Sequence, residues 1–452
     1  MLKKGFFMMT VFLLVVAVAL SACGSNKDNT ASQSPSPSPS NSNGSSDSNS
    51  SSGGDKDTKK PEEKIKLTLS DWSSGEAEKI VKNAISEFEK LHPNITVERI
   101  QIPFANYPDK IQTMMAGKTT PDVMYMSQLW FPTFAEKGAF LDLKPYTDKD
   151  TEFNYGDFLP IIQKTGEVNG GIYEIFDALD YIVLFYNKDM FTEAGVEFPN
   201  DNWTWDDLVA AGKKLTKDTN KDGTIDQYGF IAPDGYVAFS WLYQNGGAVL
   251  NDSLDQSVIH EPAAVEALKW IQDLMLVHKI SPDPSVTAQQ GTSAMFKAGQ
   301  VGMAAYGHWL NPGLDADNKF QYGVAMLPKG KVNRNSFVSG AGYAVSKDTK
   351  HQDAAWELLK WMVRPDIMIE STKLNAAVAS RKSVYESELF MSNPNNAAFI
   401  EQTKYMQPLP VTTKWNEMFD VVKSEFQLIW TGKQTAQQGA DAITAKVNKI
   451  LK

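Results

Sequence analysis

Cysteine, positive charge and histidine are all scarce in this chain of 452 residues, and each shortage excludes a class of function. The single cysteine, Cys23, has no partner for an internal disulfide, and the rest of the chain has no cysteine for a zinc site or a nucleophile. Asp and Glu total 54 against 44 Lys and Arg, and the resulting net charge of -10 disfavours nucleic acid as a partner. The five histidines are scattered, and neither His-Glu-x-x-His nor Gly-x-Ser-x-Gly occurs.

The first 22 residues have the composition of a secretory signal peptide. Lys3 and Lys4 precede an apolar segment, residues 6–20, which is shorter than the roughly 20 residues of a permanent membrane span. Leu20-Ser21-Ala22-Cys23 then resembles a bacterial lipobox. That resemblance implies cleavage before Cys23 and a diacylglyceryl group on its sulfur, so several acyl chains would anchor the chain to the membrane. The alternative is an ordinary signal peptide that happens to end beside a cysteine.

Residues 23–60 are predicted to be a disordered tether. From residue 24 to residue 60 there is no Val, Ile, Leu, Met or aromatic side chain, and the segment is rich in Ser, Pro, Asn and Gly. Such a composition buries too little apolar surface to offset the entropy lost on folding. A lipidated cysteine followed by this spacer indicates a protein held at the outer face of the cell membrane.

The globular part begins near residue 61 and opens with alternating strand and helix patterns. Apolar residues alternate over residues 65–69 and then recur at helical spacing over residues 77–91, behind a candidate cap at Ser74. Residues 95–100, 107–115 and 121–126 read as strand, helix and strand. A β-α-β-α-β order predicts a parallel, doubly wound sheet and therefore an α/β fold.

The later part of the chain is predicted to form a second α/β lobe, since its helices and strands are mixed and no internal repeat is found. The predicted helices cover residues 205–215, capped by Thr204, and residues 262–278, 352–362, 415–430 and 436–451. The predicted strands cover residues 301–306, 322–327 and 337–345.

Aromatic side chains follow two strands of the predicted first sheet. Ligands of such sheets bind beyond the carboxyl ends of the strands, where Trp72 follows Asp71 and where Gln128 and Trp130 follow the third strand. A tryptophan beside a polar group suits a sugar, because the indole packs on C–H groups while amides and carboxylates bind hydroxyls. Either tryptophan could instead belong to the core.

Several short motifs together resemble the extracellular solute-binding proteins of sugar ABC importers, the group that includes maltose-binding protein. The resemblance covers nearly the whole globular part, and its evidence is the order and spacing of these motifs: Pro121-Asp122-Val123, Tyr186-Asn187-Lys188-Asp189, Asn245-Gly246-Gly247, Gly307-His308-Trp309 and Ser339-Gly340-Ala341-Gly342. It implies a type II periplasmic-binding-protein-like fold, in which two doubly wound α/β lobes enclose a ligand cleft and are joined by a hinge of three crossings. The crossings are expected near residues 177–181, 329–335 and 374–379. One lobe would comprise 61–178 plus 336–373, and the other 179–328 plus 375–452.

The same resemblance assigns residues to the cleft. The acidic hinge residue that contacts sugar falls on Asp180, the cleft tryptophan on Trp309, and further cleft aromatics on Tyr236 and Trp415. Gly340 and Gly342 are expected to let the backbone approach the cleft, with an ordinary strand bulge as the alternative. The sequence departs from the maltose pattern at Gln128 and Trp130, where that group has charged residues. The expected sugar therefore need not be maltose.

These features predict a monomeric binding protein that is not an enzyme and requires no cofactor. It would bind a carbohydrate, in the first instance an oligosaccharide, and deliver it by cleft closure to the transmembrane subunits and ATPase of an ABC importer. Two alternatives stay open. One is an extracellular lipoprotein glycoside hydrolase with two carboxylates about 5 to 10 Å apart, and the other is a binder of a non-sugar solute such as a polyamine.

One loop matches the first half of a calcium-binding loop. Asp218, Asn220, Asp222 and Asp226 occupy its positions 1, 3, 5 and 9, with Gly223 at position 6. Position 12 is Gly229 where a bidentate Glu is needed, so a structural calcium site and a plain Asp/Asn/Gly turn are both consistent with the pattern.

Overall fold

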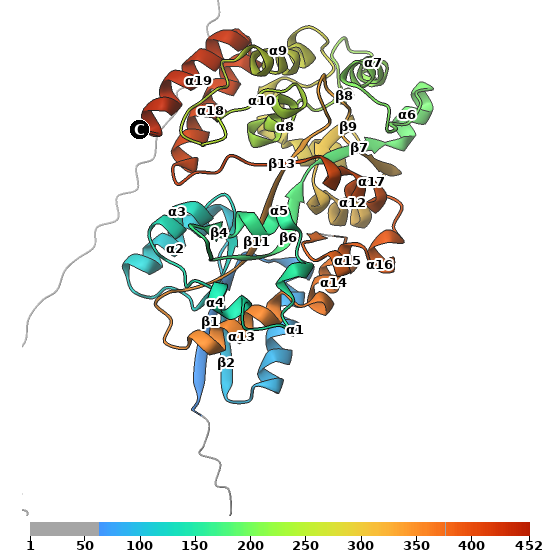
Figure 1. Cartoon of the computed structure of the whole chain (residues 1–452). Helices are drawn as coiled ribbons and strands as arrows, with labels where there is room; N and C mark the ends of the chain where they lie inside the picture. Colours follow the sequence, from blue (N-terminus) through green and yellow to red (C-terminus); the bar gives the residue numbers. More distant parts are fainter. Residues whose placement is uncertain (1–62, 376) are drawn as a thin grey trace, which may run out of the picture. The chain divides into compact units, whose positions relative to one another are not determined.

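The computed structural model describes residues 63–375 and 377–452, which belong to one compact unit, Pro61–Lys452 (Figure 1). The predicted signal peptide, Cys23 and the tether lie outside the described residues.

The first predicted sheet forms as a β-α-β-α-β unit. Strands β1 (Ile65–Asp71), β2 (Ile95–Gln101) and β3 (Val123–Ser127) are parallel, and β1 lies between the other two. Helix α1 (Gly75–Leu91) connects β1 to β2 and buries Val81, Ala84, Ile85 and Phe88, which share one face at helical spacing. Helix α2 (Tyr107–Ala116) connects β2 to β3. Ser74 precedes α1, but its side chain makes no capping hydrogen bond.

Four further strands extend this sheet to seven strands. Their order is β12-β6-β11-β3-β1-β2, with β13 also paired to β11. The added strands are β6 (Ile175–Tyr181), β11 (Ser336–Val345), β12 (Val378–Ala379) and β13 (Met406–Pro408). β11 runs antiparallel to both β3 and β6 but parallel to β13, so the sheet is mixed.

A second, four-stranded sheet lies in the other half of the unit (Figure 1). Its order is β10-β7-β9-β8, with β7 (Val183–Asn187), β8 (Tyr228–Phe230), β9 (Val301–Tyr306) and β10 (Tyr322–Ala325). The longer helices of this half are α7 (Trp205–Leu215), α9 (Pro262–Leu276), α18 (Trp415–Trp430) and α19 (Ala436–Ile450). Thr204 caps α7 as predicted, and a capping box with Asp207 completes that end of the helix.

Shorter helices fill the connections. In the first part of the chain they are α3 (Phe131–Glu136), α4 (Lys144–Thr147), α5 (Pro160–Thr165) and α6 (Lys188–Ala194). The middle contributes α8 (Phe239–Gln244), α10 (Pro284–Gln290), α11 (Thr292–Lys297) and α12 (Asn311–Asp317). Beyond β11 follow α13 (Gln352–Met362), α14 (Pro365–Lys373), α15 (Lys382–Tyr385), α16 (Glu388–Met391) and α17 (Asn396–Gln402).

The chain changes from one sheet to the other at positions that differ slightly from the predicted lobe boundaries. Tyr181 still pairs with Val338 in the larger sheet, and β7 of the smaller sheet begins at Val183. The boundary predicted between residues 178 and 179 therefore falls inside β6. Within the segment 375–452, β12 and β13 pair with the larger sheet, whereas α18 and α19 pack in the core of the smaller one.

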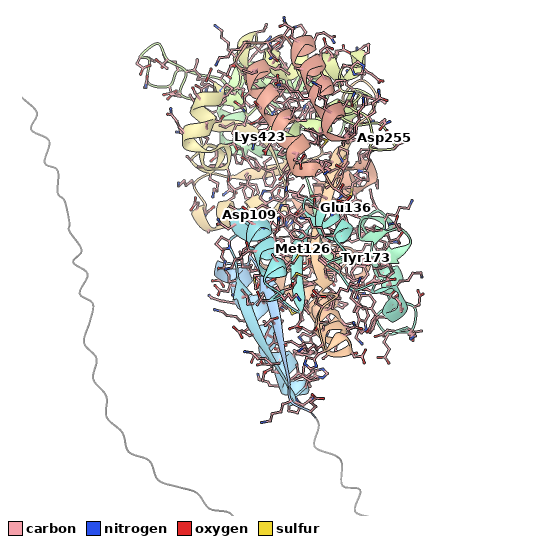
Figure 2. All side chains as sticks on the ribbon, turned by 90° about the vertical axis from the view of Figure 1, so that its left-hand side faces the viewer. Asp109, Met126, Glu136, Tyr173, Asp255 and Lys423 are labelled. Carbon is pink, nitrogen blue, oxygen red and sulfur yellow. The ribbon has the colours of Figure 1, made fainter. Side chains whose placement is uncertain are left out.

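Apolar side chains are mostly buried and charged side chains are mostly exposed, as the hydrophobic pattern predicts. Met126 on β3 is fully buried, while Asp109 on α2 and Glu136 on α3 lie on the surface of the same half (Figure 2). In the other half, Asp255 and Lys423 are exposed (Figure 2). Two large apolar cores and a smaller aromatic one therefore stabilise the unit.

Gly342 holds β11 close to β6, and its replacement is expected to destabilise the fold. A Cβ atom at this position would overlap the carbonyl oxygen of Ile175 and the Cα of Phe176, which are backbone atoms that have no room to move. We expect Gly342→Ala to lower the free energy of unfolding by about 1 to 3 kcal/mol, measured by urea denaturation. Gly156→Ala is the control, because a Cβ there meets only the Asn154 side chain at 3.8 Å. Equal denaturation midpoints for the two variants would contradict the close approach.

Candidate ligand-binding cleft

A cavity of about 1070 Å³ lies where both halves of the unit contribute residues. Trp72 enters it from the loop after β1, and Asp180 from β6. Tyr236 and Trp309 come from two short 3-10 helices, Gly235–Ala238 and His308–Leu310, that belong with the second sheet. Four residues proposed from the sequence, far apart along the chain, therefore line one cavity.

Trp72 is held by a cage of aromatic rings. Its ring centroid lies 4.5 Å from that of Tyr125, 5.2 Å from that of Tyr107 and 5.6 Å from that of Trp130. The rings of Tyr107 and Trp130 meet it edge to face, an arrangement that the aromatic quadrupole favours. One indole face can thus be offered to a ligand while the ring itself stays fixed.

Trp309 reaches the cavity from the opposite side and is 43% exposed. A side chain at Gly307 would overlap its indole ring, so the glycine makes room for the ring. Its neighbour His308 is buried. Its Nε2 lies 3.0 Å from Oδ1 of Asn396, and burial lowers the pKa of His308 to about 4.

Phe104 is a further cleft residue, which was not predicted from the sequence. It begins the 3-10 helix Phe104–Asn106 directly after β2, is 47% exposed, and lies with its ring centroid 5.3 Å from that of Trp72. The rule that pointed to the loops after the first and third strands applies equally to this loop. The signal was therefore present in the sequence.

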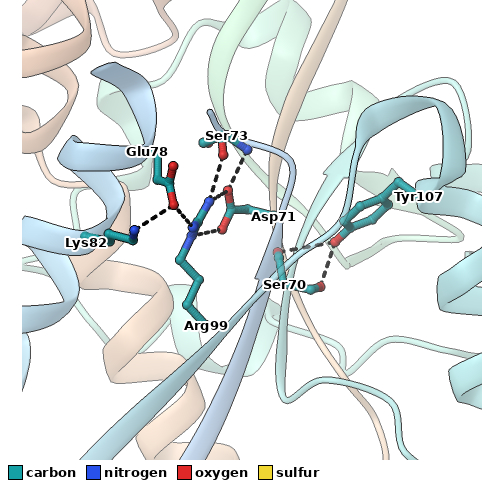
Figure 3. A network of polar contacts seen from close by, with 7 residues as sticks. All are labelled: Ser70, Asp71, Ser73, Glu78, Lys82, Arg99 and Tyr107. Atoms are coloured by element: carbon teal, nitrogen blue, oxygen red, sulfur yellow. Dashed lines mark hydrogen bonds and ion pairs between the residues drawn. The ribbon is translucent and has the colours of Figure 1, made fainter. Parts of the chain in front are cut away.

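The loop that carries Trp72 is clamped by Arg99 (Figure 3). The guanidinium donates from Nε and Nη2 to the two carboxylate oxygens of Asp71, at 2.6 and 2.8 Å, and from Nη2 to the Ser73 carbonyl at 2.8 Å. Its Nη1 also donates to Glu78, and the Ser73 amide donates to Asp71. The residues on either side of Trp72 are thus tied to a single side chain, and Asp71 is fully buried.

The other four proposed ligand residues do not line the cavity. Trp130 is buried behind Trp72, where it supports the aromatic cage. Gln128 is buried between the cavity-lining residues Ser127 and Leu129. Trp415, at the start of α18, stacks on Phe419 at 5.1 Å in the core of the second half.

Gly340 is the fourth of these residues, and it faces β6 and not a ligand. A Cβ there would lie 2.7 Å from the Ala178 carbonyl oxygen and from a ring carbon of Phe176. Its neighbours Ser339 and Ala341 line the cavity instead. The strand pairing also shifts register between Ala341 and Gly342, so a bulge is present at this position of the sheet.

Two carboxylates of β6 line the cavity and titrate near neutrality. Burial raises the pKa of Asp180 from its ordinary value of 3.8 to about 6. Burial, with a smaller contribution from the charge of Asp180, raises the pKa of Asp177 to about 7. Among the described residues that line the cavity, the one basic side chain is Lys373 of α14, which pairs with Glu370.

These raised pKa values predict that the unliganded protein loses stability as pH rises. The folded state binds more protons than the unfolded state between about pH 4 and pH 7, so the free energy of unfolding falls across that interval. Between pH 5.5 and pH 8 we expect a loss of about 1 to 3 kcal/mol from the pair, reduced by screening from water in the cavity. Urea denaturation at the two pH values, with an Asp177→Asn/Asp180→Asn variant, measures it. An identical pH dependence in both proteins would contradict the assignment.

The loop proposed for calcium is closed by its own hydrogen bonds. Asp218 accepts from the amides of Asp222 and Gly223, and Asp226 accepts from the amide and hydroxyl of Thr219. Within the part of the chain that the structure describes, no three or more His, Cys, Asp or Glu side chains are grouped to hold a metal ion. Calcium binding by Asp218, Asn220, Asp222 and Asp226 stays a prediction, which a calcium titration would test.

Within residues 63–375 and 377–452, no helix has both the length and the apolar character needed to cross a membrane.

Solved structures with the same architecture are ligand-binding proteins. The ABC substrate-binding protein Lmo0181 from Listeria monocytogenes, in complex with cycloalternan, is 28% identical, with a TM-score of 0.79 over 86% of this chain and 99% of that one. Together with the cavity, this likeness defines a type II periplasmic-binding-protein-like α/β fold, as predicted.

The model of the bacterial extracellular solute-binding protein family matches residues 72–369, and the chain belongs to this family. The galactooligosaccharide-binding protein of Bacillus subtilis (strain 168) is 26% identical over 451 residues, covering 97% of this chain and 96% of that protein. The sn-glycerol-3-phosphate-binding periplasmic protein UgpB of Escherichia coli (strain K12) is 23% identical over 416 residues, covering 85% and 92% respectively. The chain is therefore similar to binders of sugars and to a binder of a phosphate ester.

Proposed function

We propose that this protein binds an oligosaccharide in the cavity and delivers it to an ABC importer. The observation that carries the proposal is the arrangement of aromatic rings around a carboxylate, with Trp72, Phe104, Tyr236 and Trp309 lining the cavity that holds Asp180. Aromatic faces pack on the C–H faces of sugar rings, and a carboxylate accepts hydrogen bonds from hydroxyls. The volume of about 1070 Å³ suits more than one sugar ring.

The charge of the cavity supports a neutral sugar over a phosphate ester. Its lining holds one basic side chain and four acidic ones, which are Lys373 against Glu76, Asp177, Asp180 and Asp315. Two of the acids have other partners, because Glu76 pairs with Lys79 and Asp315 accepts from Tyr322 and Asn375. A phosphate would meet net negative charge here, whereas hydroxyl groups would find acceptors.

The transport role rests on the family and on the resemblance of the first residues to a lipoprotein signal. Cleavage before Cys23 and acylation of its sulfur would tether the protein to the outer face of the membrane, with residues 24–60 as a flexible spacer. A ligand that contacts residues of both halves would favour the closed form, which the permease subunits and their ATPase would receive. The protein then acts as a binder and not as an enzyme.

Calorimetry of the folded protein with a panel of sugars tests the proposal. The panel contains maltotriose, mannotriose and a galacto-oligosaccharide, with glycerol 3-phosphate and spermidine as non-sugar probes. We expect at least one oligosaccharide to bind with a micromolar or tighter dissociation constant and the two non-sugar probes not to bind. Binding of glycerol 3-phosphate or spermidine alone would contradict the sugar assignment. Chromatography of the same mixtures detects turnover, and product formation would indicate a hydrolase.

The lipid anchor has its own test. Expression of the full chain in a bacterium that acylates lipoproteins should place it in the membrane fraction, and Cys23→Ala should release it. A membrane-bound Cys23→Ala protein would contradict anchoring through this sulfur.

A further inference from the structure

The carboxylates of Asp177 and Asp180 lie on the same strand but three residues apart. In a regular strand side chains alternate between faces, so residues separated by an odd number point to opposite sides of the sheet. Yet both Asp177 and Asp180, as well as Ala178, line the cavity. The regular alternation of side chains in β6 must therefore be interrupted near Asp177.

A β-bulge at Asp177 provides this turn. On β11, Ala341 pairs with Ala178, and the next residue, Gly342, pairs with Phe176. Asp177 is thus the extra residue of β6, which has no opposite partner on β11. Bulges of this kind bring two successive side chains to one face and re-aim them, often beside functional sites.

Asp177 also has unused hydrogen-bonding capacity. Its Oδ1 is buried and has no partner among the described residues, while the Tyr125 hydroxyl on β3 hydrogen-bonds to the carboxylate. A buried acceptor without a partner costs free energy. The fold therefore carries a destabilising carboxylate at the place where a ligand would lie.

We infer that Asp177, turned into the cavity by the bulge of β6, is a second ligand-contacting carboxylate, and that it selects ligands presenting hydroxyl donors to Asp177 and Asp180 together. This inference rests on the proposed function. Two adjacent hydroxyls of one sugar ring offer such donors, whereas a deoxygenated or O-methylated ring does not. The family resemblance placed an acid only at Asp180.

The surroundings of Asp177 make ligand binding depend on pH. The ionisable groups around it are Tyr125 on β3, Tyr343 on β11, Asp180 on β6 and Glu174 just before β6, and burial raises the pKa of each. None of them supplies positive charge. Hydroxyl donors stabilise the ionised carboxylate, so sugar binding should release protons and strengthen as pH rises from 6 to 8. For a pKa of about 7, Asp177 contributes about tenfold to this gain in affinity, and Asp180, with a pKa of about 6, contributes about twofold.

Calorimetry of Asp177→Asn with the tightest-binding oligosaccharide of the panel tests the inference. Asn keeps the size of the side chain and removes the charge. We expect at least a tenfold loss of affinity at pH 8. The gain in affinity between pH 6 and pH 8 should fall from about twentyfold to about twofold, the remainder arising from Asp180. Asp109→Asn, an exposed residue on α2 (Figure 2), removes the same charge outside the cavity and should bind like the unaltered protein.

A second measurement needs no variant. Calorimetry of the unaltered protein at pH 7 in two buffers of different ionisation enthalpy gives the number of protons released on binding, which we expect to be about one half. Unchanged affinity of Asp177→Asn, or no proton release, would overturn the role of Asp177 while leaving sugar binding intact. If no oligosaccharide binds to the unaltered protein, the proposed function fails and this inference fails with it.

Discussion

Replacing Arg99 with methionine is expected to lower the free energy of unfolding by about 3 to 5 kcal/mol, the usual cost of leaving one partner of a buried ion pair uncompensated. Asp71 is fully buried and receives two hydrogen bonds from this guanidinium (Figure 3). Methionine fills much of the same volume, so the loss comes from the unpaired carboxylate. Urea denaturation monitored by circular dichroism measures the change.

Arg364→Met is the matched control for Arg99. Arg364 also pairs with an aspartate, Asp366, but the two side chains are 41% and 57% exposed, and such a surface pair contributes about 1 kcal/mol or less. The double variant Asp71→Asn/Arg99→Met should regain part of the loss, because the buried charge is gone. If Arg99→Met and Arg364→Met are equally stable, Arg99 does not clamp the Trp72 loop as described.

Replacing Trp309 with alanine is expected to weaken oligosaccharide binding by about 2 to 4 kcal/mol, or roughly 30-fold to 1000-fold in the dissociation constant. The indole lines the cavity and is 43% exposed without a ligand, so its removal should leave the fold intact while it deletes a packing surface for a sugar ring. Titration calorimetry with the tightest sugar of the panel measures the loss.

Two further variants show whether this loss comes from the aromatic ring of Trp309. Trp309→Phe keeps an aromatic face and should recover most of the affinity. Tyr405→Ala removes an aromatic ring that is 37% exposed but does not line the cavity, and it should bind as the unaltered protein does. A dissociation constant for Trp309→Ala within threefold of the unaltered value would exclude a stacking role.

Most elements of the fold could be predicted from the sequence because their signals are local. Helices α13 and α18 and strand β9 have the predicted bounds, and α7 begins at its predicted cap, since apolar periodicity and capping residues lie within each segment itself. The addition of β6, β11, β12 and β13 to the first sheet had no such local signal. The pairing of β6 with β11 depends on contacts between residues more than a hundred positions apart, such as Tyr181 with Val338.

Only some of the residues proposed for the cleft line the cavity, and the incorrect assignments have a physical cause. Trp72, Asp180, Tyr236 and Trp309 line the cavity, whereas Trp130 and Trp415 are buried in the cores. A tryptophan at the end of a strand or the start of a helix has the same sequence signature whether its ring turns outward or inward. Asp177 was not predicted for a related reason. The bulge turns its side chain to the other face of the sheet, and the pattern of apolar and polar residues in the strand does not reveal a bulge.

A crystal structure of the protein with the oligosaccharide that binds most tightly tests the central claim most directly. The account predicts sugar rings packed against Trp72 and Trp309, with hydroxyls hydrogen-bonded to Asp180, so that the ligand contacts both halves of the unit. A sugar bound elsewhere, or bound in this cavity without contact to either tryptophan, would contradict it.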